Sequence, residues 1–241
     1  MNPEKEAGRA GVDFYATYDR YKAYETPTLN AKAVRRFDRE CWVPADCSPA
    51  MSVLEIGCGT GLFLAYLREK GVADFLGIDR DRKLAAHLPV EVKENFIAAD
   101  VREFLEGGAM GRTFDRVVML DVLEHFSPEE GAAMLKGIAG ILNPGAKVLV
   151  RTPNMASPWG GQYQFGDFTH RCAFTPDSMR QLALASGFEC RACYAHEEGS
   201  ASRRFRDRIV HKIAAYFVMT PPEIWSANFF ALLTPRQGLQ D

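Results

Sequence analysis

Short apolar runs alternate with helical periodicity through the middle of the chain. Five runs read as buried strands, at 51–56, 75–78, 95–99, 114–120 and 146–150. Amphipathic helical patterns lie between them, most clearly over 62–70 and 128–141. Strands that alternate with helices predict a parallel sheet with right-handed crossovers and helices on both faces.

The C-terminal third departs from this alternation. Residues 153–174 predict a long polar and aromatic loop, and 188–194 and 228–233 predict two more strands. Between those strands, residues 202–218 combine basic side chains with apolar ones at helical spacing, which predicts an inserted basic amphipathic helix. The helix either covers the edge of the sheet or meets a membrane surface or a partner.

Three glycines follow the first predicted strand. Gly57, Gly59 and Gly61 stand where the strand should turn into the helix at 62–70. Glycine permits a sharp turn and a close approach of ligand to backbone, and the N–H groups of the helix start favour an anionic or polar group. A dinucleotide-binding fingerprint would place its third glycine at Leu62, so the spacing here is a different one.

The stretch Glu-Ile-Gly-Cys-Gly-Thr-Gly at 55–61 resembles motif I of the class I S-adenosylmethionine (SAM) methyltransferases. Leu-Asn-Pro-Gly at 142–145 resembles that family's turn before strand five. The resemblance covers roughly 50–190 and implies an α/β, Rossmann-like, seven-stranded sheet that ends in an antiparallel hairpin. SAM would be the methyl donor and S-adenosylhomocysteine the product.

The resemblance also implies a set of donor-binding residues. The glycine turn would cradle the methionine part of SAM, Asp79 would bind the ribose hydroxyls, and Asp100 would contact the adenine amine. The whole expected set is Glu55, Gly57, Cys58, Gly59, Gly61, Asp79, Arg80, Asp100, Val101 and Leu120. We expect the methyltransferase domain at 46–241, with the helical insertion at about 202–218, and an N-terminal helical extension at 1–45. That extension is either a lid over the donor or a helix packed on the core.

Composition narrows the setting. The 241 residues are 47% hydrophobic and 25% charged, with a net charge of −2, which argues against broad nucleic-acid binding. Neither a signal-peptide pattern nor a bilayer-spanning run is visible, so we expect a cytoplasmic protein with reduced thiols. Cys190 and Cys193 form a C-x-x-C within a predicted strand, where an offset of three should point them to opposite faces.

A cluster of polar residues follows the fourth strand. Asp121, Glu124 and His125 fall at i, i+3 and i+4, so one helical turn would gather them. Together they could bind a divalent cation, or His125 alone could be a general base. The third interpretation is a capping and packing role for this turn.

His170 lies in the long loop. A Glu-x-x-Glu-His turn followed by a later histidine resembles the metal-dependent small-RNA 3′-terminal 2′-O-methyltransferases. That resemblance implies Mg²⁺ or Mn²⁺ held by Asp121, Glu124, His125 and His170, with Asp121 a departure from glutamate. His170 could also be a base or substrate binder without metal, or a structural histidine. The predicted catalytic set is His125, His170 and Asp121.

The loop also suggests an acceptor. Thr-His-Arg-x-x-Phe-Thr-Pro at 169–176 resembles bacterial sugar and polysaccharide O-methyltransferases, and aromatic and polar loop side chains suit a pyranose ring. We therefore expect O-methylation of a sugar, sugar nucleotide or glycan. The alternatives are a small-molecule O-methyltransferase of the quinone-precursor or catechol type, and a catalytically silent SAM-fold subunit. An RNA 3′-end acceptor fits the charge balance poorly, and a homodimer is left open.

Overall fold

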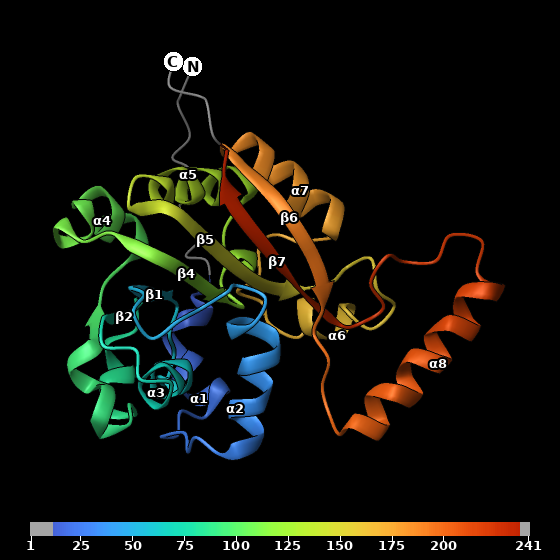
Figure 1. Cartoon of the computed structure of the whole chain (residues 1–241), viewed down its shortest axis with the longest axis horizontal. Coiled ribbons are helices and arrows are strands. Elements are labelled where there is room, and N and C mark those ends of the chain that lie inside the picture. Colours follow the sequence, from blue (N-terminus) through green and yellow to red (C-terminus); the bar gives the residue numbers. More distant parts are fainter. Residues whose placement is uncertain (1–11, 237–241) are drawn as a thin grey trace, which may run out of the picture.

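The computed structural model describes residues 12–236, which form one seven-stranded sheet with helices on both faces (Figure 1). The strands run in the order β3-β2-β1-β4-β5-β7-β6. All neighbours are parallel except β7, which is antiparallel to β5 and to β6. The strands are β1 (Val53–Ile56), β2 (Phe75–Asp79), β3 (Phe96–Ala98), β4 (Phe114–Leu120), β5 (Leu142–Pro153), β6 (Phe188–Ala195) and β7 (Asn228–Pro235). The predicted fold class is confirmed.

Eight α-helices accompany the sheet in the described chain. They are α1 (Tyr18–Lys22), α2 (Ala31–Phe37), α3 (Leu62–Glu69), α4 (Val101–Glu106), α5 (Pro128–Ala139), α6 (Gly161–Gln164), α7 (Pro176–Ala185) and α8 (Ala201–Phe217). The helix α8 lies between β6 and β7, at the position of the predicted insertion. Among residues 12–236, none of the helices is both long enough and apolar enough to cross a membrane.

Local sequence signals fix where the two longer helices on one face begin. Ser127 accepts a hydrogen bond from the Glu130 backbone N–H while the Glu130 side chain accepts one from the Ser127 N–H, so α5 starts with a capping box. A proline at the first helical position has no N–H to leave unpaired there. Thr175 and Ser178 cap α7 in the same reciprocal way.

The sheet separates two hydrophobic cores. Along β4, Val117 and Met119 face the core beneath α4, α5 and α7, whereas Val118 faces the core beneath α2 and α3. All three side chains are buried. Because consecutive side chains of a strand point to opposite faces, one unbroken apolar run supplies both cores.

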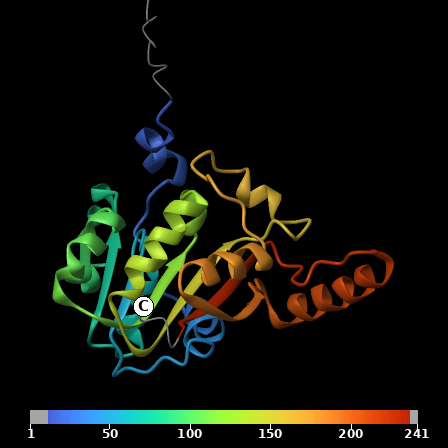
Figure 2. The same ribbon diagram turned by 90° about the horizontal axis from the view of Figure 1, so that it is seen from above.

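The N-terminal extension divides into two parts. The α2 part packs into the core, since Phe37 is buried and its ring lies 5.1 Å from that of Tyr66 on α3. The α1 part instead lies at the edge of the sheet, beside the loop that follows β5 (Figure 2). The α2 part therefore packs on the core, and a lid over the donor stays a prediction for the α1 part. Residues 1–11 of the predicted extension lie outside the described part of the chain.

Two local predictions are wrong. The Leu-Asn-Pro-Gly stretch is part of β5, which begins at Leu142. Cys190 and Cys193 do not point to opposite faces, because a β-bulge between Cys190 and Ala192 changes the alternation of β6. Their sulfur atoms lie 3.6 Å apart, and their hydrogen bond lowers the pKa of the Cys190 thiol.

A buried arginine joins the extension to the sheet. Arg116 on β4 is 4% exposed, and its guanidinium donates to the backbone carbonyls of Ala45, Asp46 and Asp115 at 2.6, 2.8 and 2.6 Å. We expect Arg116→Leu to lower the free energy of unfolding by about 2–4 kcal/mol, because three carbonyls lose a charged donor. Urea unfolding followed by circular dichroism measures this.

Arg191→Leu is the matched control for that substitution. Arg191 is exposed on β6 and pairs with Glu189, so its loss should change the stability by about 0.5 kcal/mol or less. Equal effects of the two substitutions would contradict the anchoring role of Arg116.

Candidate active site at the carboxyl edge of the sheet

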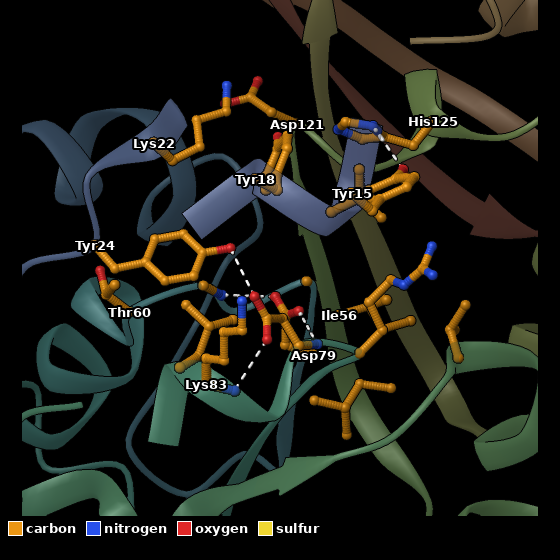
Figure 3. Close-up of a pocket in the computed structure, with 18 of the residues that line it drawn as sticks. Tyr15, Tyr18, Lys22, Tyr24, Ile56, Thr60, Asp79, Lys83, Asp121 and His125 are labelled. Carbon is orange, nitrogen blue, oxygen red and sulfur yellow. Dashed lines mark hydrogen bonds between the residues drawn. The ribbon is translucent and has the colours of Figure 1, made fainter. Parts of the chain in front are cut away.

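A cavity of about 1150 Å³ opens at the carboxyl ends of the parallel strands (Figure 3). The loops after β1, β2, β3 and β4 form one wall, and residues 13–28 of the N-terminal extension form the other. Open α/β sheets bind ligands at this edge, where neighbouring loops diverge. The cavity is therefore the candidate active site.

The glycine turn after β1 adopts a backbone that other residues rarely adopt. Gly57 has φ +70° and lies against Val122 of the loop after β4, so closely that a Cβ on Gly57 would overlap the valine Cγ2 atom. Gly59 has φ +53°, and Gly61, with φ +80°, precedes α3. The close packing of two loops therefore requires glycine at position 57.

The carboxylate of Asp79 is held in place from both sides at the end of β2. One oxygen accepts a 3.0 Å hydrogen bond from the Gly59 N–H, and the other accepts a 3.0 Å bond from the Asp81 N–H. Burial raises the pKa of Asp79. From the opposite wall, the Tyr24 hydroxyl donates to Asp81 at 3.0 Å (Figure 3). The remaining lone pairs of Asp79 can accept from a vicinal diol, as the ribose prediction requires.

The predicted donor-binding residues divide into two groups. Six line the cavity, namely Gly57, Gly59, Asp79, Arg80, Asp100 and Val101. The other four, Glu55, Cys58, Gly61 and Leu120, are absent from its lining. Glu55 and Cys58 are buried, and Gly61 instead packs against Leu88. Residue type and spacing located the loops correctly, but they did not show which side chains face inward.

The prediction that one helical turn gathers three polar residues is wrong for Asp121. Its backbone has φ +59°, so the turn of Leu123–His125 begins only after it. Its carboxylate forms a two-contact ion pair with Arg151 of β5, with Nε 2.9 Å from Oδ1. Asp121 lines the cavity but does not join the other polar residues.

Glu124, His125 and His170 do come together. One ligand atom from each lies within 4.8 Å of the other two. Glu124 is fully buried, neither of its carboxylate oxygens has a hydrogen-bond partner in the described chain, and burial together with the charge of Asp121 raises its pKa. The Glu124 carbonyl accepts from the backbone N–H groups of Arg171 and Cys172, which holds the long loop against this turn.

The hydrogen bonds of the two imidazoles define their free nitrogens. His170 Nδ1 lies 3.0 Å from the Gln164 carbonyl, which only accepts, so Nδ1 carries the proton. His125 Nδ1 lies 3.0 Å from the Thr169 hydroxyl and 3.3 Å from the Tyr15 hydroxyl (Figure 3). Because the Thr169 hydroxyl itself donates to Asp167 at 2.6 Å, His125 Nδ1–H donates to Thr169. Both Nε2 atoms therefore carry a lone pair. Burial, together with the nearby His170, lowers the pKa of His125 to about 4.

Asp167 connects this cluster to the N-terminal extension. It accepts from the Tyr18 hydroxyl at 3.0 Å and pairs with Lys22 at 2.9 Å. Burial alone would raise the pKa of Asp167, but the hydrogen bonds from Thr169 and Lys22 outweigh this effect and lower it. The sequence pattern gave Thr169 no role, and the lid alternative for the extension did not say which of its residues reach the site.

The aromatic side chains expected to hold a pyranose ring are placed elsewhere. Trp159, Tyr163, Phe165 and Phe168 are exposed and do not line the cavity. Phe168 instead packs on Phe14, with ring centroids 5.2 Å apart. Among the described residues, the long loop therefore contributes none of its aromatic side chains to the lining of this cavity.

We expect Gly57→Ala to weaken binding of S-adenosylhomocysteine at least about tenfold, because the new methyl must displace Val122 and strain the turn. Isothermal titration calorimetry measures the affinity. Gly145→Ala is the control, since Gly145 has φ +78° but open space around it. The double variant Gly57→Ala/Val122→Ala should recover part of the affinity. Equal losses of affinity in Gly57→Ala, the double variant and Gly145→Ala would contradict the packing argument.

Comparison with known proteins identifies the family of this chain. The profile of a family described as "Methyltransferase domain" matches residues 22–192. A ubiquinone biosynthesis O-methyltransferase of Rhizobium johnstonii is 30% identical over 176 residues, which are 67% of this chain and 68% of the relative. For several other relatives with that name, the match spans about half of the relative's length, as with the 47% for that of Bradyrhizobium sp. strain ORS 278.

Solved structures share the fold. A SAM-dependent methyltransferase from Archaeoglobus fulgidus superposes with a TM-score of 0.67 at 18% identity and covers 92% of this chain and 99% of its own. Magnesium protoporphyrin IX methyltransferase from Synechocystis, with bound S-adenosylhomocysteine, gives 0.59 at 17% identity and covers 92% and 95%. The chain thus belongs to the methyltransferase-domain family and is a SAM-dependent methyltransferase.

Proposed function

We propose that this enzyme transfers the methyl group of SAM to a hydroxyl of a small aromatic molecule. The sugar or glycan acceptor expected from the loop sequence lacks support from the comparisons. The Rhizobium relative is named for O-methylation in ubiquinone biosynthesis, which favours the small-molecule alternative. The observation that carries the proposal is His125 in the wall of the donor cavity with Nε2 free to accept a proton.

The cavity has room for a second molecule beside the donor. Its volume of about 1150 Å³ exceeds the usual range of roughly 300–1,000 Å³ for a single ligand. Around His125, the wall is formed by the aromatic side chains of Tyr15, Tyr18 and Phe126. Flat apolar surfaces beside a base suit a planar aromatic acceptor with an acidic hydroxyl.

The proposed reaction needs alignment and removal of one proton. The acceptor oxygen attacks the methyl carbon in line with the carbon–sulfur bond, which breaks as S-adenosylhomocysteine leaves. His125 Nε2 accepts the hydroxyl proton, and its Nδ1–H donates to Thr169, which donates to Asp167. The Asp167 carboxylate stabilises the imidazolium through Thr169. Holding the reactants in this geometry supplies much of the rate, because alignment alone can be worth roughly 7–11 kcal/mol.

We also propose that Glu124, His125 and His170 bind a divalent transition-metal ion. The two unpartnered oxygens of buried Glu124 and one ring nitrogen from each histidine form a suitable donor set. Two imidazoles with one carboxylate suit Mn²⁺ or Zn²⁺ better than Mg²⁺, which prefers oxygen ligands. A bound ion would acidify an acceptor hydroxyl, and His125 Nε2 would then be a ligand rather than the base.

We expect His125→Ala to lower kcat about 10²–10⁴-fold while the affinity for S-adenosylhomocysteine stays within a factor of a few. A screen with labelled SAM against catechols, hydroxybenzoates, quinols, sugar nucleotides and glycans identifies the acceptor and then gives kcat. Because the neutral imidazole is the active form, kcat should be flat from pH 6 to 8 and fall as the pH approaches about 4. Turnover of glycans alone would contradict the acceptor class.

Thr169→Val tests the support of His125. Valine keeps the shape of threonine and removes the hydroxyl between His125 and Asp167. We expect a loss of about tenfold in kcat with KM unchanged, since the substitution affects the orientation of the imidazole and the stability of its charged form but not binding of the acceptor. An acid limb of the pH profile that moves with this substitution would identify His125 as the titrating group. Unchanged kcat in both variants would contradict a proton-accepting role.

For the metal site, Glu124→Gln should weaken Mn²⁺ binding at least about tenfold, measured by electron paramagnetic resonance of free Mn²⁺. Glu91→Gln is the control and should leave the affinity unchanged, because Glu91 is exposed and lies outside the cluster. Activity that survives EDTA, in a protein that binds no Mn²⁺ or Zn²⁺, would contradict the metal proposal and leave the base mechanism.

A further inference from the structure

The helix α8 presents its apolar side away from the rest of the protein. None of its residues is buried in the described chain, and Figures 1 and 2 both show it standing apart from the sheet. Its inner side is polar, since the His211 ring stacks on Trp225 at 5.3 Å and Arg204 donates to the Gly199 carbonyl at 2.7 Å. The usual arrangement of an amphipathic surface helix is therefore reversed.

The outward side forms a continuous apolar stripe. Phe205, Ile209, Ile213 and Tyr216 are between 43% and 85% exposed. At 3.6 residues per turn they fall within about 80° of the helix circumference. Exposed Phe217 and Met219 extend the apolar surface past the C-terminal end of the helix. An apolar surface of this kind marks an interaction site.

Two cations flank this stripe. Lys212 lies about 20° beyond one edge of it and Arg206 about 20° beyond the other. Neither forms an ion pair with any residue from 12 to 236, whereas Arg204 and Arg208 both pair with Glu197. Long basic side chains beside an apolar stripe can keep their charges in water while their stems lie along the apolar surface.

We propose that α8 binds the surface of an anionic lipid bilayer, with the apolar stripe between the headgroups and Arg206 and Lys212 on the lipid phosphates. This arrangement matches an interfacial helix, in which apolar burial and charge attraction act together. A second copy of the chain fits less well. Two-fold pairing through the stripe would set the cationic flanks of one helix beside those of the other, and Asp207 on the far side is already near Arg203.

The attachment of α8 relates this surface to the active site. The residue that starts β7, Asn228, pairs with Pro153 at the carboxyl end of β5, so α8 extends from the edge that carries the cavity. The segment after α8 is bonded to the loop that bears His170, through Asn154 to the Ile224 carbonyl at 2.8 Å and Ser157 to the Trp225 carbonyl at 2.7 Å. Lipid binding would therefore hold that loop close to the bilayer. The inference does not depend on the identity of the acceptor.

Vesicle co-sedimentation tests the proposal with the full chain. We expect sedimentation with vesicles of phosphatidylcholine and phosphatidylglycerol, little with phosphatidylcholine alone, and release by high salt. Phe205→Ser/Ile209→Ser/Ile213→Ser should abolish binding, and Arg206→Glu/Lys212→Glu should weaken it by about one order of magnitude or more. Unchanged affinity of each variant for S-adenosylhomocysteine shows that the catalytic domain is folded.

Matched controls carry the same substitutions elsewhere. Val43→Ser/Val90→Ser/Leu184→Ser removes three exposed apolar side chains, and Lys93→Glu/Lys136→Glu reverses two exposed charges. Both should sediment like the wild type. The proposal is overturned if the wild type stays in the supernatant with every vesicle, or if the triple α8 variant sediments equally well. It is also overturned if light scattering shows a dimer, without lipid binding, that the triple variant makes monomeric.

Discussion

The contact between Gly57 and Val122 is the constraint on which the site depends. It brings the loop after β1 against the loop after β4, and a side chain at position 57 would separate them. On one side of this contact, the Gly59 N–H fixes the Asp79 carboxylate. On the other side, the chain continues directly into the turn that carries His125. Backbone packing therefore places the groups proposed to bind the donor and to accept the proton relative to one another.

The sequence predicted the sheet well because its central strands β1, β2 and β4 are buried on both faces. A continuous apolar run such as 117–120 predicts a buried strand, and glycine or aspartate at its end marks the loop that follows. The same reasoning failed within those loops. Asp121 and Glu124 are both acidic and only three positions apart. A left-handed backbone at Asp121 and its ion pair with Arg151, which is distant in the sequence, nevertheless keep the two carboxylates apart. Such partners cannot be read from local spacing.

The bulge in β6 shows the same limit at a single residue. Alternation would place Cys190 and Cys193 on opposite faces, and one extra residue brings their sulfur atoms together. The N-terminal extension shows the same limit over a longer segment. Its Phe37 packs in the core, whereas its Tyr15 lines the cavity. In each case the deciding interaction joins residues far apart in the chain or depends on a backbone irregularity that composition does not encode.

The Asp167 carboxylate accepts hydrogen bonds from Thr169 of the long loop and from Tyr18 of the N-terminal extension, and it forms an ion pair with Lys22 of that extension. A nucleoside that left the cavity past this wall would have to break those extension contacts. The Asp167 carboxylate would then lose two of its four contacts and keep only the hydroxyl and the backbone N–H of Thr169. With the wall open, the proposed base would thus be held loosely, and a reactive sulfonium would meet an organised proton acceptor only behind a closed wall, where stray water is scarce.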